Sequence, residues 1–131
     1  MDQKKLEKVV LQLESYVECW RQLSHYLNQA RLKKFDQDDE SQFLEFKCVV
    51  TQELEGIFAA MECSIPTKDE IHKLLINCPS IRYLSELNET SLRGLENQWH
   101  KIYIAWHSNL GQLKAARHVQ QNASRWWWFR R

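Results

Sequence analysis

Two stretches of about thirty residues carry apolar side chains at alternating spacings of three and four, over residues 3–34 and 91–121. This spacing places the apolar side chains on one face of an α-helix, which is the pattern of a long amphipathic helix that packs on a core. With only three glycines and two prolines in 131 residues, the chain lacks the turn composition of β architectures. The two stripes are Leu6, Val9, Leu13, Tyr16, Trp20, Leu23, Leu27 and Ala30, and Leu92, Leu95, Trp99, Ile102, Trp106, Leu110, Leu113 and Ala116.

A third long helix is predicted over residues 40–64, with Asp38 or Asp39 as its N-cap. Leu44 and Phe58 lie outside its main apolar stripe, so we expect this helix to make contacts on two sides. The stripe itself consists of Phe43, Phe46, Val50, Leu54, Ile57 and Met61.

The segment between residues 67 and 87 predicts two short helical pieces. Thr67 and Glu70 have the spacing of a capping box, which marks a helix start. Pro79 lacks a backbone N–H and disfavours helical angles in the residue before it, so a helix that begins there must break.

These elements predict an all-α fold, an antiparallel helical bundle with three long helices and one short, proline-broken helical segment. A four-helix up-down-up-down bundle is favoured and places both termini at one end. A three-helix bundle is the alternative and places them at opposite ends. We assign residues 1–122 to a single bundle domain and residues 123–131 to a C-terminal tail rich in aromatic residues and arginine.

Charge is distributed unevenly along the chain. Residues 36–62 contain one lysine against eight acidic residues, whereas residues 99–131 contain six lysines and arginines and no acidic residue. We expect the basic segment to lie beside the acidic one within the fold. The alternative is an outward basic face for an anionic partner.

No pattern in the sequence indicates an enzyme, a metal site or a cofactor site. The Glu-x-x-His motif of carboxylate-bridged metal pairs is absent, and no glycine-rich phosphate loop occurs. His100, His107 and His118 share one side of the last helix with Lys114 and Arg125, but their separations are too long for one metal ion to bridge two of them. We therefore predict no catalytic residues, no cofactor, no metal and no small-molecule substrate.

The four cysteines are too far apart for a zinc or redox motif, so we expect buried free thiols in a reducing compartment. We also expect neither a classical signal segment nor a membrane span, because no apolar stretch is long enough. A cytoplasmic location follows as the prediction, with membrane-peripheral attachment as the further possibility.

The end of the chain carries the functional prediction, because its four consecutive aromatic rings need shelter from water. Together they expose about 600–1,000 Å², more than the largest apolar patch usual on a soluble monomer, about 300–600 Å². The predicted interaction residues are Arg125, Trp126, Trp127, Trp128, Phe129, Arg130 and Arg131.

Three destinations for this segment stay open: the chain's own bundle, a protein partner or second copy, and an anionic membrane surface. Over eight residues the segment resembles Trp/Arg-rich membrane-active peptides. Nucleic acid is a less favoured partner, because Trp99 and Trp106 occupy the core stripe rather than a basic groove. We predict a non-enzymatic interaction or assembly subunit that self-associates through this segment, and a peripheral membrane protein as the alternative.

Overall fold

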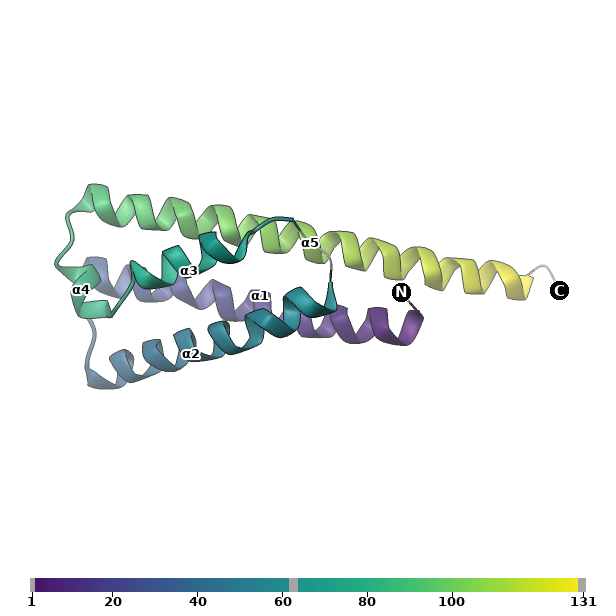
Figure 1. The fold of residues 1–131 in the computed structure, drawn as a ribbon, viewed down its shortest axis with the longest axis horizontal. Helices are drawn as coiled ribbons and strands as arrows, with labels where there is room; N and C mark the ends of the chain where they lie inside the picture. Colours follow the sequence, from purple (N-terminus) through teal and green to yellow (C-terminus); the bar gives the residue numbers. More distant parts are fainter. Residues whose placement is uncertain (1, 62–63, 130–131) are drawn as a thin grey trace.

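The computed structural model describes residues 2–61 and 64–129, and for residues 124 and 127–129 it describes the backbone alone. Over this part of the chain the secondary structure consists of five α-helices and no strand, which confirms the all-α bundle (Figure 1). The helices are α1 (Gln3–Leu32), α2 (Gln37–Ala60), α3 (Lys68–Ile76), α4 (Ile81–Ser85) and α5 (Glu89–Phe129).

The helix starts follow local capping chemistry. Asp36, rather than the predicted Asp38 or Asp39, caps α2: its carboxylate accepts the N–H of Asp39, whose own carboxylate accepts the N–H of Asp36, both at 2.9 Å. This reciprocal pair starts α2 three residues earlier than predicted. Thr67 caps α3 as predicted, and the break at Pro79 separates α3 from α4.

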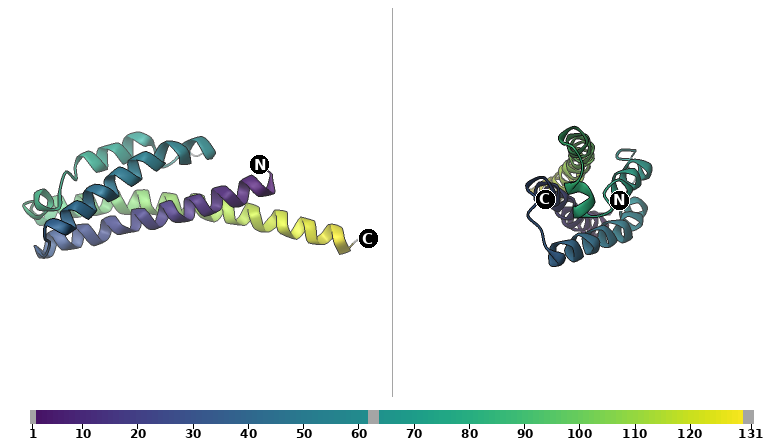
Figure 2. Two further views of the ribbon diagram at one scale, coloured as in Figure 1. Left: turned by 90° about the horizontal axis from the view of Figure 1, so that it is seen from below. Right: turned by 90° about the vertical axis from the view of Figure 1, so that its left-hand side faces the viewer.

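α1 is the central helix of the bundle. It packs against α2, α4 and α5, while α3 packs on α5 and α4 on α2. Seen along the bundle axis, α1 lies between α2 and α5 (Figure 2). Both termini lie at the same end (Figure 1). α3 and α4 contain only nine and five residues. The four-helix topology, in which these two short helices together count as the fourth helix, therefore stays a prediction.

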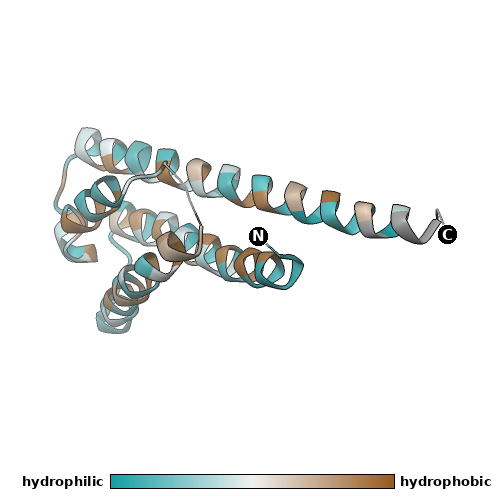
Figure 3. Cartoon of the chain, turned by 45° about the vertical axis from the view of Figure 1, so that its right-hand side comes forward, coloured by the Kyte–Doolittle hydropathy of each residue, from teal (hydrophilic) through white to brown (hydrophobic). Residues whose placement is uncertain are grey.

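The apolar stripes form the core, as predicted for every position of α1 and for the main stripe of α2. Figure 3 shows these apolar positions recurring along the long helices between hydrophilic ones. Two tryptophans, Trp20 and Trp106, are fully buried, and the ring of Tyr16 stands edge-on to both. Tyr16 donates a buried hydrogen bond to the carbonyl oxygen of Val50 at 3.0 Å, which joins α1 to α2.

Phe58, which lies outside the main stripe, contacts an element other than α1, as predicted. Its ring packs edge-on against Trp106 of α5, with 5.9 Å between ring centroids. Leu44 and Ile104, by contrast, are both more than half exposed.

α5 extends much further than predicted. Its helix continues past the expected end near Gln121 to Phe129, so its 41 residues measure about 61 Å, against about 45 Å for the 30 residues of α1. The predicted core position Ala116 is exposed, and no described α5 side chain after Leu110 is buried. We call residues 111–129 the arm, because this part of α5 leaves the bundle core and runs on past the N-terminus of α1 (Figure 1).

Candidate functional site

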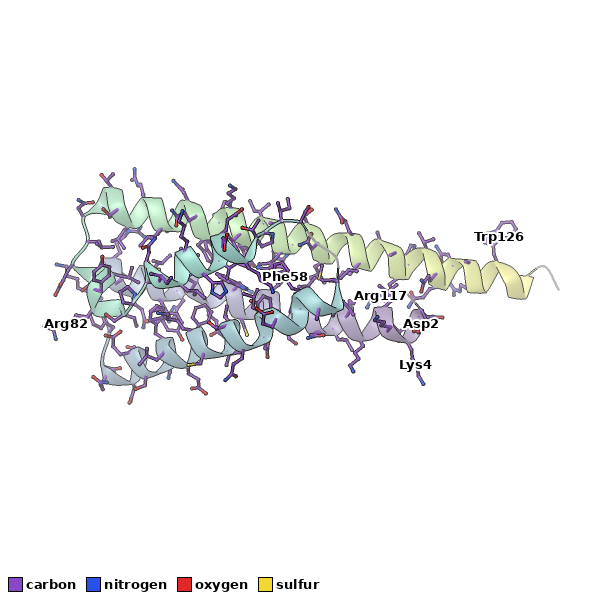
Figure 4. All side chains as sticks on the ribbon, in the orientation of Figure 1. Asp2, Lys4, Phe58, Arg82, Arg117 and Trp126 are labelled. Atoms are coloured by element: carbon purple, nitrogen blue, oxygen red, sulfur yellow. The ribbon has the colours of Figure 1, made fainter. Side chains whose placement is uncertain are left out.

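The base of the arm lies against the first turns of α1. Leu113 packs on the edge of the core, and Lys114 reaches Glu14 of α1, with 3.9 Å between Nζ and Oε1. Arg117 lies alongside the N-terminal part of α1, whereas the side chain of Trp126 stands on the helix beyond Asp2 (Figure 4). The arm is therefore supported on one side at its base and projects at its tip.

The structure places the first two predicted interaction residues at the surface of this tip. Arg125 is exposed, and the Trp126 side chain retains 65% of its accessible surface. The backbone of Trp127, Trp128 and Phe129 continues the helix, and Arg130 and Arg131 lie outside the described residues.

A helical backbone decides how the aromatic run is presented. Successive residues of an α-helix point about 100° apart, so four consecutive positions cover its whole circumference. A single flat surface cannot shelter all four. The backbone of residues 123–129 also leads away from the bundle (Figure 1), so within the described residues the segment does not fold back over its own core.

Two apolar side chains mark one edge of the arm. Val119 and Trp126 are seven residues apart, which is close to two helical turns, and both are about two-thirds exposed at 66% and 65%. Ala115 lies on the same line one turn before Val119 and is exposed as well. We call these three residues the outer edge of the arm.

The predicted basic line along α5 is at the surface. His100, His107, Lys114, His118 and Arg125 are all exposed. His107 stands edge-on to Tyr103 at 4.6 Å between ring centroids, and Tyr103 stacks on Trp99. Among residues 2–61 and 64–129, no three histidine, cysteine, aspartate or glutamate side chains gather in a way that could hold a metal ion.

The thiols do not share one environment, as the sequence suggested. Cys78 is buried, Cys19 is half-buried and Cys48 is exposed, so the prediction of uniformly buried cysteines is wrong. Burial raises the pKa of the Cys78 thiol to about 11. Cys63 lies outside the described residues.

The expected proximity of the basic segment and the acidic one holds at one point, where Phe58 packs against Trp106, but no ion pair joins the two segments among the described residues. The ion pair that α2 forms in the described part of the chain joins Glu55 to Lys68, which precedes the basic segment, and α5 contacts α1 more extensively than α2. Glu45 and Glu53 of α2 and Arg125 of the arm are exposed and form no ion pair among the described residues.

Sequence reasoning missed a hollow on the surface between α1 and α2, which we call the α1–α2 groove. Its volume is about 290 Å³, and its walls come from these two helices alone. The residues that line it are Cys19, Gln22 and Tyr26 of α1 and Gln42, Glu45, Phe46 and Val49 of α2. No local motif marks these positions, because they meet only when the two helices pack.

Comparison of the chain with protein-family models, with curated proteins and with solved structures finds no match. None of the described helices combines the length and the apolar content that a membrane crossing needs. The geometry of the arm and of the α1–α2 groove is thus the basis for a functional proposal.

Proposed function

We propose that this chain is a non-enzymatic helical-bundle subunit that assembles with protein, including further copies of itself, through its C-terminal arm. The observation that carries the proposal is the projection of α5 beyond the bundle with Arg125 and Trp126 exposed at its tip. Tryptophan and arginine are the residues most enriched at the energetic centres of protein interfaces.

The energetics favour a partner for this tip. Because Trp126 is 65% exposed, covering it removes about 100–160 Å² from water, which at about 25 cal/mol per Å² corresponds to roughly 2.5–4 kcal/mol before ordering costs. The ordering cost is small for an arm that is already helical, because the backbone entropy has been lost on folding. A preformed helix that carries aromatic and basic side chains is suited to dock on the surface of another protein.

Deletion of residues 125–131 tests this function. We expect the full chain to have a mass in solution well above its monomer value of 15.8 kDa and the shortened chain to have the mass of its own, smaller monomer. A matched variant with alanine at positions 126–129 keeps the helix and the arginines, so it separates the aromatic contribution from the basic one. The same number of chains per particle for all three proteins by light scattering, with no other protein captured by the full chain alone, would refute the proposal.

The second candidate function is reversible attachment to an anionic membrane surface through the same arm. It is supported by the exposed pair Arg125 and Trp126, because basic and aromatic side chains together favour the lipid interface. Flotation with anionic and neutral vesicles at low and high salt tests it. Binding restricted to anionic vesicles and weakened by salt favours attachment, and failure to float with either dismisses it.

A further inference from the structure

The α1–α2 groove has apolar side chains in its wall and two glutamates, Glu45 and Glu53, along its α2 edge, which we call its acidic rim. Phe46 and Val49 contribute apolar surface to its wall, and Glu45 stands among the lining residues. Glu53 follows Val49 by four residues and so lies one turn further along the same edge of α2. The two carboxylates extend negative charge along the groove.

Groups inside the groove respond to this negative charge. Burial, reinforced by the carboxylates of Glu53 and Glu18, raises the pKa of the Cys19 thiol. Burial, reinforced by Asp39 and Glu45, raises the pKa of the Tyr26 hydroxyl. Burial is the main cause of both shifts, and the neighbouring carboxylates, which favour a cation over an anion, add to it.

The size of the groove suits a side chain better than a metabolite. Its 290 Å³ lies at or below the lower limit of about 300 Å³ that is usual for small-molecule pockets. A helix laid along the groove would need to place only one large apolar residue in the hollow, with a basic residue next to it. The arm carries that combination at Arg125 and Trp126.

The charge of the arm decides which surface it can bind. No acidic residue follows Glu96, so two arms laid side by side would place like charges against each other. The acidic rim of the α1–α2 groove is the complementary surface within this chain. A straight arm cannot reach the groove of its own copy, because the arm leads away from the bundle, whereas the groove lies between α1 and α2 (Figure 1).

We propose that the arm of one copy binds along the α1–α2 groove of a second copy, with Trp126 over Phe46 and Val49 and with Arg125 beside Glu45. This inference rests on the proposed assembly function and names its partner surface. Reciprocal exchange of the two arms gives two identical contacts per pair of molecules and closes the assembly as a dimer. The outer edge of the arm supplies the apolar contact, and the acidic rim sets the position of the helix.

Charge exchange at Arg125 and Glu45 tests the pairing. We expect Arg125→Glu and Glu45→Lys each to raise the dissociation constant of the dimer about three- to tenfold, because each places like charges together. The double variant restores opposite charges and should return within about twofold of the wild-type value. Sedimentation equilibrium of the full-length proteins measures all four constants.

The matched control is Glu86→Lys, which makes the same charge change at an exposed position after α4 that does not line the groove. Its dissociation constant should stay at the wild-type value. Thermal unfolding by circular dichroism verifies that each variant is folded, and Glu45→Gln provides a milder groove variant should Glu45→Lys fail to fold. The milder change should raise the constant about two- to threefold.

The outcomes separate the groove from the assembly function. A higher dissociation constant in both single variants, and its return towards the wild-type value in the double variant, supports the groove pairing. Association that ends on deletion of residues 125–131 but is unaffected by Glu45→Lys or Glu45→Gln overturns the groove pairing and leaves the assembly function intact. A full chain that is monomeric at every concentration overturns the self-association inferred here.

Discussion

Replacing Gly94 and Gly111 by alanine should stabilise the protein. Both glycines lie inside α5, where glycine is about 0.8–1 kcal/mol less favourable than alanine. An added Cβ at either position meets no atom within 4 Å, so the substitution creates no clash that would offset this gain. Each single variant should therefore gain close to the full helix-propensity difference.

The expected effect on melting follows from the size of the chain. At about 2.1 cal/mol/K per residue, 131 residues give an unfolding entropy of about 275 cal/mol/K, so about 0.9 kcal/mol raises Tm by about 3 °C. The double variant should gain about twice as much, because the two sites are 17 residues apart in one helix.

Thermal unfolding followed by the helical circular dichroism signal measures both single variants and the double variant. Gly94→Ala serves as the reference, because that site lies where α5 is packed in the bundle, whereas Gly111→Ala is at the start of the arm. A Tm that rises for Gly94→Ala and falls for Gly111→Ala would refute the assignment of a continuous helix through the start of the arm. Unchanged values for both would refute the propensity argument.

Three further outcomes follow from the structure. Tyr16→Phe should lower the unfolding free energy by about 1 kcal/mol in urea titration, because the carbonyl of Val50 loses the hydrogen bond from the Tyr16 hydroxyl. An unchanged urea midpoint would contradict a contribution of this hydrogen bond to stability. The folded-state pKa of Cys78 lies above the ordinary thiol value of 9.0, so its contribution to stability is complete below pH 9 and is lost as the pH rises towards about 11. Cys78→Ala should make the unfolding free energy less dependent on pH in this range. A thiol reagent at pH 8 should label the exposed Cys48 well before the buried Cys78. Self-association through the arm should weaken steadily as salt is raised, because exposed charges are screened. A dissociation constant independent of salt would contradict a contribution of charge pairing to the contact.

The bundle could be predicted from the sequence because its stripes are long and strongly periodic. Every predicted core position of α1 is buried, since a 30-residue helix with partners on several sides uses its whole apolar face. The break at Pro79 was equally readable, because it follows from the covalent structure of proline.

The end of α5 was harder to place, because the apolar stripe and the helix end at different positions. The stripe fades after Leu113 where the bundle ends, yet no glycine or proline follows Gly111, so nothing in the sequence stops the helix. Ala116 illustrates the difference: it continues the spacing of the stripe, but it is exposed. The spacing of apolar residues predicts which side chains are buried, whereas the length of a helix depends on where a stop signal such as glycine or proline occurs.

The α1–α2 groove was beyond sequence reasoning for a different reason. Glu45 and Cys19 have ordinary local surroundings, and their proximity depends on how α1 and α2 pack. The arm, in contrast, was recognisable as a contact segment because its composition is unusual over consecutive residues. A site on one continuous segment can be read from a sequence, and a site shared by two helices requires the fold.

The central position of α1 has a consequence for the order in which the chain matures at the ribosome. α1 precedes the other described helices in the chain, and its most extensive contact is with α5, which follows them. Until α5 has emerged, the α5-facing side of α1 has no native cover, so nascent chains ending before residue 110 expose apolar surface that chaperones recognise. Emergence of α5, rather than formation of the hairpin of α1 and α2, is the event that closes this core.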